Sequence, residues 1–107
     1  MKKVIRDGRV AVLFSPGFGS GWSTWSGDEF KDWALFSPEV VAWVEGGKVG
    51  DIDEIVNSAH GYDNSFYLGG ASDLEIDWIP VGTQFRIDEY DGSESVVVNH
   101  DEYWSVA

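Results

Sequence analysis

The residues with the greatest potential for chemistry lie in a glycine-rich segment, SPGFGSGWSTWSG, at positions 15–27. Glycines leave backbone amides open to close approach, and hydroxyl and aromatic side chains are the groups from which small ligand sites are built. The sequence predicts a binding loop that consists of Phe18, Gly19, Ser20, Trp22 and Trp25. The alternative is a crossing loop whose Trp residues fill the core, because Trp is mostly buried in most folds.

This segment does not match the known phosphate-binding loops. In a dinucleotide fingerprint the third glycine would stand one residue later than Gly21, at the start of a helix. A P-loop would continue with Lys, whereas Gly21 is followed by Trp22. If the ligand carries phosphate, the guanidinium groups of Arg6, Arg9 or Arg86 are the predicted partners, because bidentate hydrogen bonding suits phosphate oxygens.

The charge balance favours a basic partner over nucleic acid. Seven Lys and Arg residues oppose 19 Asp and Glu residues, which gives a net charge of -12. Such a field repels nucleic acid and anionic membranes and attracts basic protein surfaces. The predicted acidic interaction face comprises Asp88, Glu89, Asp91 and Glu94, since neighbouring same-face residues in a strand lie about 7 Å apart, near the spacing of phosphates. The alternative is an ordinary solvated face that keeps an aromatic-rich protein soluble.

Catalytic and metal-binding signatures are sparse. The chain has no Cys and two His residues, and His60, just before Gly61, suits the C-terminal end of a helix. No nucleophile elbow or calcium-loop pattern is present, so we expect no enzyme activity, no metal and no cofactor. A small hydrolase that uses two carboxylates as acid and base is a third alternative.

The segments that must position these residues are predicted, in chain order, to be strands, then helices, then strands. Asp7-Gly8 predicts a tight hairpin turn that leads into a central strand over residues 10–14. Ser37-Pro38-Glu39 opens a helix that ends at Gly46-Gly47, and a second helix starts at Asp51 and stops at Gly61. A further strand is suggested at residues 66–68.

From Leu74 the hydrophobic period changes to two. The alternation predicts a three-strand meander with turns at Pro80-Val81-Gly82 and Asp91-Gly92. The expected fold is α+β: a small, mostly antiparallel sheet made of the N-terminal hairpin and the C-terminal meander, with two short helices. Residues 1–107 form a single predicted domain.

The composition also sets expectations on location and assembly. No apolar run reaches the length of a membrane span, and the first residues leave no room for a signal-peptide apolar region, so we expect a cytoplasmic protein without membrane contacts. A small sheet with open edges and six Trp residues leaves a homo-oligomer open.

Three stretches, VIRDGRVAVLFSPGFGSGWSTW, WALFSPEVVAWVEGG and LEIDWIPVGTQFRIDEYDGSES, resemble a group of short uncharacterised proteins from tailed phages and prophages. The resemblance covers most of the chain and assigns no role to any residue. It implies a viral protein in the host cytoplasm that binds and inhibits a host enzyme or defence system.

Two functions follow as expectations. The first is a non-enzymatic counter-defence protein that sequesters a small nucleotide-like ligand at the glycine-rich loop. The alternative is an acidic inhibitor that mimics nucleic acid and occupies the basic groove of a host defence or nucleic-acid enzyme.

Overall fold

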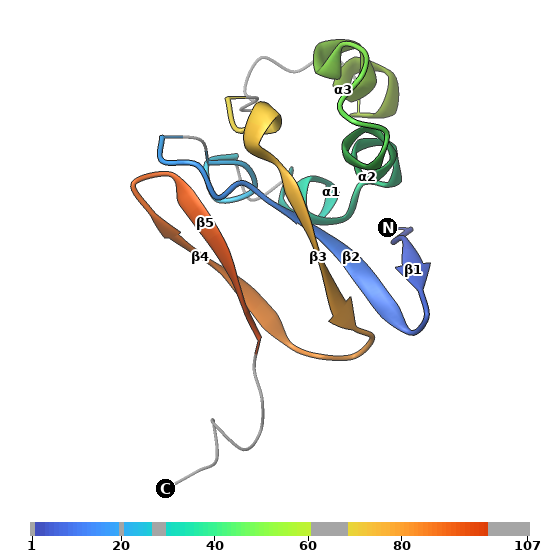
Figure 1. Ribbon diagram of the computed structural model, residues 1–107, viewed down its shortest axis with the longest axis vertical. Coiled ribbons are helices and arrows are strands. Elements are labelled where there is room, and N and C mark those ends of the chain that lie inside the picture. The colour runs from blue at the N-terminus through green and yellow to red at the C-terminus, as the bar shows by residue number, and fades with distance from the viewer. Residues whose placement is uncertain (1, 20, 27–29, 61–68, 99–107) are drawn as a thin grey trace, which may run out of the picture.

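The computed structural model describes residues 2–19, 21–26, 30–60 and 69–98. The strands are β1 (Ile5–Arg6), β2 (Arg9–Phe14), β3 (Glu75–Pro80), β4 (Phe85–Tyr90) and β5 (Ser93–Val98). The helices are α1 (Lys31–Phe36), α2 (Pro38–Glu45), α3 (Ile52–His60) and a short 3-10 helix, η2 (Ala71–Asp73). The strands form two antiparallel sheets, so the fold is α+β as the sequence predicts (Figure 1). The strand expected at residues 66–68 and the helix stop at Gly61 lie outside the described residues.

The N-terminal hairpin forms where the sequence predicts it. Asp7 and Gly8 have φ angles of 52° and 74°, the positive values that a type I′ turn requires at both central positions. β2 is the central strand of the order β1-β2-β3, and its residues 10–13 are buried. Burial on both faces explains why this strand is apolar throughout rather than alternating.

The predicted meander is wrong in its pairing. β3 pairs with β2, with Phe14 opposite Glu75 and Arg9 opposite Pro80, and it joins the N-terminal hairpin in one sheet. β4 and β5 form a separate two-stranded sheet. The turn at Gly82 is present, with φ +86° and a hydrogen bond from the Thr83 N–H to the Pro80 carbonyl, but it carries the chain from one sheet to the other. The period of two identifies strands but not their partners.

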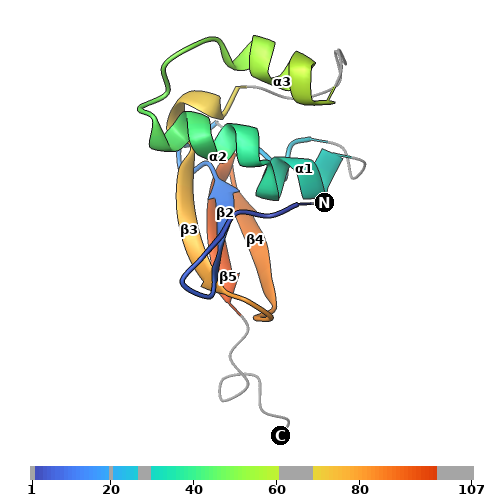
Figure 2. The ribbon, with the colours of Figure 1, turned by 90° about the vertical axis from the view of Figure 1, so that its right-hand side faces the viewer.

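The three-stranded sheet lies between two layers, which are visible in Figures 1 and 2. Ala11 and Leu13 of β2 join a core cluster with Val40 and Val41 of α2. The alternate residues Val10 and Val12 form a second cluster with four hydrophobic residues of the β4–β5 hairpin, namely Phe85, Ile87, Val96 and Val98. The hairpin therefore covers one face of the sheet and α2 covers the other, while α1 contributes Leu35 and Phe36 to the cluster on the hairpin side.

Ser37 separates two consecutive helices. Its Oγ accepts a hydrogen bond from the Val40 N–H at 3.3 Å and caps α2, as the sequence predicts, while its own N–H donates to the Trp33 carbonyl and closes α1. The restriction that Pro38 places on the preceding residue keeps Ser37 out of helical geometry, at ψ 118°. Helix α1 was not predicted from the sequence, because this six-residue helix has no side-chain N-cap and is held by the burial of its apolar residues.

The β4–β5 hairpin presents two different faces. Asp91 and Gly92 have φ angles of 51° and 84°, so this predicted two-residue turn is also confirmed. The register pairs Glu89 with Glu94, and alternation directs both toward the inward side of the hairpin, where Glu94 is buried and Glu89, next to the turn, is exposed. Asp88 and Tyr90 lie on the opposite, exposed face. None of the helices in the described ranges has the length and apolar character that crossing a bilayer requires.

Candidate functional site

The glycine-rich loop is organised around one buried carboxylate, that of Glu94, which is 1% exposed. Its Oε1 accepts a hydrogen bond from the Ser15 N–H at 2.9 Å. Its Oε2 accepts bonds from the backbone N–H groups of Trp22 and Thr24, each at 2.9 Å, and from the Thr24 hydroxyl at 2.6 Å. Among the described residues no cation pairs with Glu94, so these four donors replace the water that the carboxylate loses on burial.

This finding corrects the prediction that Glu94 belongs to an acidic interaction face. Glu94 stands two residues before Val96 and four before Val98, on the inward face of the hairpin. The loop's backbone donors meet it there, because a loop without regular structure must satisfy its buried amides through side chains. The position of Glu94 could have been inferred from the sequence. The Asp91-Gly92 turn fixes the pairing of β4 with β5, and this register places Glu94 on the same face as Val96 and Val98.

Further hydrogen bonds fasten the start of the loop to the hairpin turn. The Glu94 N–H donates to the Ser15 carbonyl at 2.8 Å, and the Ser93 hydroxyl donates to the Pro16 carbonyl at 2.6 Å. The Gly19 N–H donates to the Asp91 carbonyl at 2.7 Å, and Gly19 adopts a φ of +73° that favours glycine. Segments more than 70 residues apart in the chain therefore form one unit.

Trp22 is part of the core and does not form an exposed stacking surface. Its side chain is 0% exposed, and its indole Nε1 donates to the Ala34 carbonyl at 2.7 Å. The predicted role in stacking on a ligand is corrected to the alternative, a loop Trp that fills the core. A buried indole needs a partner for its N–H, and α1 supplies it.

Trp25 is the partly exposed Trp of the loop, at 39%. Its Nε1 donates to Glu89 Oε1 at 3.3 Å, and Glu89 Oε2 accepts the Gly92 N–H at 3.1 Å. A Cβ placed on Gly21 would lie 2.3 Å from the Trp25 ring, so only glycine allows this ring to lie so close to the backbone. Trp25 thus links the loop to the side of the hairpin.

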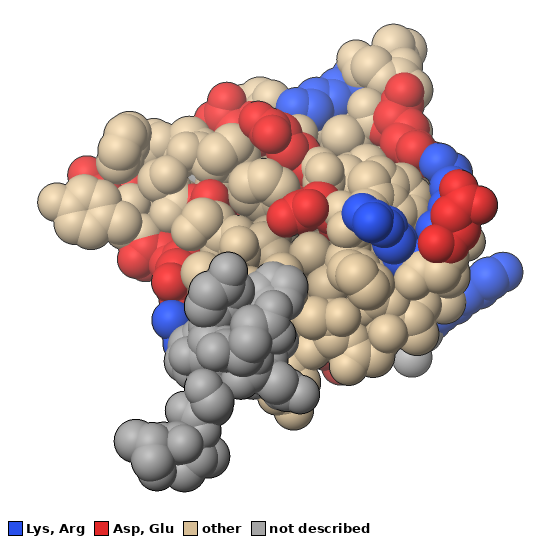
Figure 3. Space-filling view, turned by 60° about the horizontal axis from the view of Figure 1, so that its bottom comes forward, with Lys and Arg blue, Asp and Glu red and all other residues tan. Residues whose placement is uncertain are grey.

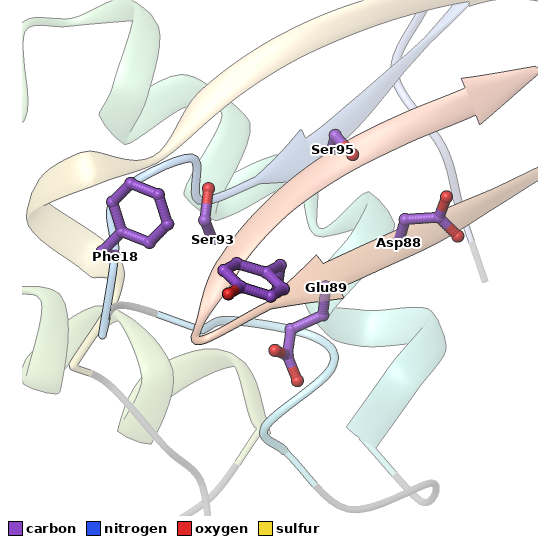
Figure 4. Close-up of a pocket in the computed structure, with 6 residues that line it drawn as sticks. Phe18, Asp88, Glu89, Ser93 and Ser95 are labelled. Atoms are coloured by element: carbon purple, nitrogen blue, oxygen red, sulfur yellow. The ribbon is translucent and has the colours of Figure 1, made fainter.

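The loop and the hairpin enclose an open pocket of about 450 Å³ at the hairpin turn. We call it the tip pocket, and its lining residues are Phe18, Asp88, Glu89, Tyr90, Ser93 and Ser95. Figure 4 shows Phe18 on the loop, across from the side chains carried by β4 and β5. Phe18 and Tyr90 are 73% and 77% exposed, and their rings meet edge to face with centroids 6.4 Å apart. The pocket therefore combines exposed aromatic rings with carboxylates.

A second pocket of about 320 Å³ lies between the loop, α1 and β4. We call it the β4–α1 pocket, and it is lined by Ser23, Thr24, Ser26, Lys31, Leu35, Phe85, Arg86 and Ile87. Arg86, a predicted ligand residue, lies here and pairs through Nε with Asp88 Oδ1 at 2.9 Å. Lys31 was not predicted as a site residue, because α1 itself was not predicted.

The other two predicted phosphate partners lie elsewhere. Arg9 begins β2 and the loop follows its end, so about 17 Å of strand separates them, at roughly 3.3 Å per residue. Arg6 forms two hydrogen bonds with Glu45 of α2, at 2.5 and 2.9 Å, and stands over the Trp78 ring. These bonds and the charge of Glu45 raise the pKa of Arg6. The structure thus brings together Phe18, Gly19, Trp25, Asp88, Glu89 and Asp91 but not Arg6 or Arg9, while Ser20 lies outside the described residues.

The two ends of the molecule also differ in charge. On the face drawn in Figure 3, acidic side chains predominate on the left, and basic side chains are more frequent on the right. In Figure 1 the hairpin turn lies on the left and β1 on the right. Among the described residues, no three His, Cys, Asp or Glu side chains are grouped so that they could hold a metal ion.

Comparison with known proteins gives no assignment: no family model, no curated protein and no solved structure matches this chain.

The Glu94 network generates the first prediction. In Glu94→Gln an amide NH2 replaces one oxygen and faces donors instead of accepting from them. We expect a loss of about 2–4 kcal/mol in the free energy of unfolding, because buried N–H groups lose a charged acceptor. Urea denaturation followed by Trp fluorescence measures it.

Glu75→Gln is the matched control, because Glu75 is an exposed strand carboxylate. We expect a change below about 0.5 kcal/mol there, as for most surface substitutions. Equal stability of the two variants would contradict the structural role of Glu94.

The two Trp residues of the loop generate the second prediction. Trp22→Ala should reduce the free energy of unfolding by about 3–5 kcal/mol, since it empties a buried site. Trp25→Ala should reduce it by about 1 kcal/mol or less, because its ring is partly exposed and its hydrogen bond is long. Thermal melting of both variants tests this order, and a larger loss for Trp25→Ala would overturn the assignment of Trp22 to the core.

Proposed function

We propose that this protein is a non-enzymatic binding protein whose tip pocket recognises a basic surface on another protein. The supporting observation is the pair of exposed rings, Phe18 and Tyr90, beside the carboxylates of Asp88 and Glu89. Large exposed aromatic residues on a small soluble domain are a feature of interaction sites, where they supply most of the binding energy.

The chemistry of the tip pocket suits a guanidinium or ammonium group. The electron-rich face of an aromatic ring attracts a cation within about 6 Å of its centroid, and a carboxylate can pair with the same group. Glu89 is already held by Trp25 and the Gly92 amide, so it is pre-positioned, whereas Asp88 is half-exposed and paired with Arg86. An Arg side chain of the partner fits this combination best, because its planar group can both stack and form paired hydrogen bonds.

Charge and rigidity support the same assignment. A net charge of -12 attracts a basic partner over a distance and raises the association rate. The hydrogen bonds of Glu94, Ser93 and Gly19 hold both walls of the pocket in place before binding. A preformed site loses less conformational entropy when the partner docks.

The geometry favours the acidic inhibitor over the loop-bound nucleotide. Phe18 lies among carboxylates, Trp22 is buried, and Arg6 and Arg9 are distant from the loop, so the groups that a nucleotide needs there are not assembled. The resemblance to short phage and prophage proteins suggests a host protein with a basic groove as the partner. Binding alone would then produce inhibition.

The third prediction tests recognition at the tip pocket. In a ¹H–¹⁵N NMR titration with a synthetic peptide of alternating Arg and Gly, we expect the amide shifts to concentrate at residues 18–19 and 88–95. Raising the salt from about 50 to about 500 mM should weaken binding by about tenfold, because the attraction is electrostatic. Phe18→Ser should weaken it by a similar factor through lost cation–π contact.

The controls separate a specific site from general acidity. Asp88→Asn with Asp91→Asn removes two charges at the tip, while Asp53→Asn with Glu54→Gln removes two from exposed positions of α3. Only the tip pair should weaken peptide binding beyond the effect of net charge. Equal losses for the two pairs, or shifts spread over α3, would contradict the proposal.

A further inference from the structure

We propose that the β4–α1 pocket is a second binding site, for a small organic anion that joins a phosphate group to a flat ring, as in a nucleoside monophosphate. This site is separate from the tip pocket and does not depend on the function proposed for it. It places an anionic ligand between α1 and β4, where Arg86 was predicted from the sequence as a phosphate partner and Lys31 was not.

The convergence of cations is the first argument. After Arg9 the chain contains three Lys or Arg residues, and two of them, Lys31 and Arg86, line this one pocket. They come from α1 and β4, 55 positions apart in the sequence, so the fold brings them together. In so acidic a protein, Lys31 and the guanidinium of Arg86, whose charge is partly offset by its pairing with Asp88, provide a local attraction for an anion against the overall field.

The rest of the lining suits the non-phosphate part of such a ligand. Leu35, Phe85 and Ile87 supply apolar surface, and the Phe85 ring is fixed by an edge-to-face contact with Phe36 at 6.0 Å. A volume of about 320 Å³ is at the lower end of the range for small-molecule sites. A single ring system with one phosphate is therefore the appropriate size.

Two hydroxyl groups of the glycine-rich loop, those of Thr24 and Ser26, line the same pocket. The Thr24 hydroxyl donates to Glu94 and the Ser26 hydroxyl donates to the Trp22 carbonyl. With their hydrogens used in this way, these oxygens offer lone pairs and accept hydrogen bonds. The pocket thus offers positive donors for a phosphate together with acceptors for the hydroxyl or amino groups of a nucleoside.

The test uses three probes in separate NMR titrations at low salt: adenosine 5′-monophosphate, adenosine and inorganic phosphate. We expect the monophosphate to shift amides at residues 23–26 and 85–87, and to bind at least about tenfold more tightly than either half, because both parts of the pocket contribute. No saturable shift with the monophosphate, or equally tight binding of phosphate alone, would overturn the proposal.

Variants that each remove one positive charge test whether the monophosphate binds in this pocket. Lys31→Ala and Arg86→Ala should each weaken binding of the monophosphate by about fivefold or more, since each removes a cation from the pocket. Lys48→Ala removes the same charge at a distant position, where Lys48 Nζ donates to the Ser72 carbonyl, and should change the affinity by less than about twofold, a long-range effect that salt screens. Equal effects of Lys31→Ala and Lys48→Ala would show attraction by net charge only and would contradict a built site.

Discussion

The hydrogen bonding of the Glu94 carboxylate is the constraint on which the rest of the structure depends. A loop rich in glycine has few side chains with which to fix itself, and its buried amides must find acceptors. Glu94 supplies acceptors to Ser15, Trp22 and Thr24 from a strand that follows some 70 residues later. The loop, the hairpin and α1, which receives the Trp22 indole, therefore depend on one side chain.

This arrangement explains why both pockets lie around the β4–β5 hairpin. The inward face of the hairpin holds Glu94 and the apolar residues that cover the central sheet, and its outward face and its turn carry Asp88 and the exposed Tyr90. The tip pocket forms where the loop reaches past the turn, and the β4–α1 pocket forms where the same loop returns toward α1. One scaffold thus supports a pocket lined by aromatic rings and carboxylates and a second pocket lined by Lys31 and Arg86.

Local structure was largely predictable from the sequence, and long-range pairing was not. Asp-Gly turns and the Ser37-Pro38 cap follow from backbone preferences within a few residues, and the structure confirms them. The pairing of β3 with β2 depends on which apolar faces meet in three dimensions, and alternation does not encode this. At the site, Phe18 and Asp88 were predicted as surface residues, and the burial of Trp22 was one of the two alternatives that the sequence left open. The burial of Glu94 was not predicted, because it follows from contacts across the fold.

Amide hydrogen exchange tests most directly whether Glu94 organises the loop. In the wild-type protein, the N–H groups of Ser15, Trp22 and Thr24 should exchange about as slowly as that of Val12 in β2, although all three residues lie outside any helix or strand. In Glu94→Gln, these three amides should lose protection before Val12 does. Rapid exchange of all three in the wild-type protein, at the rate of an unfolded chain, would contradict the account.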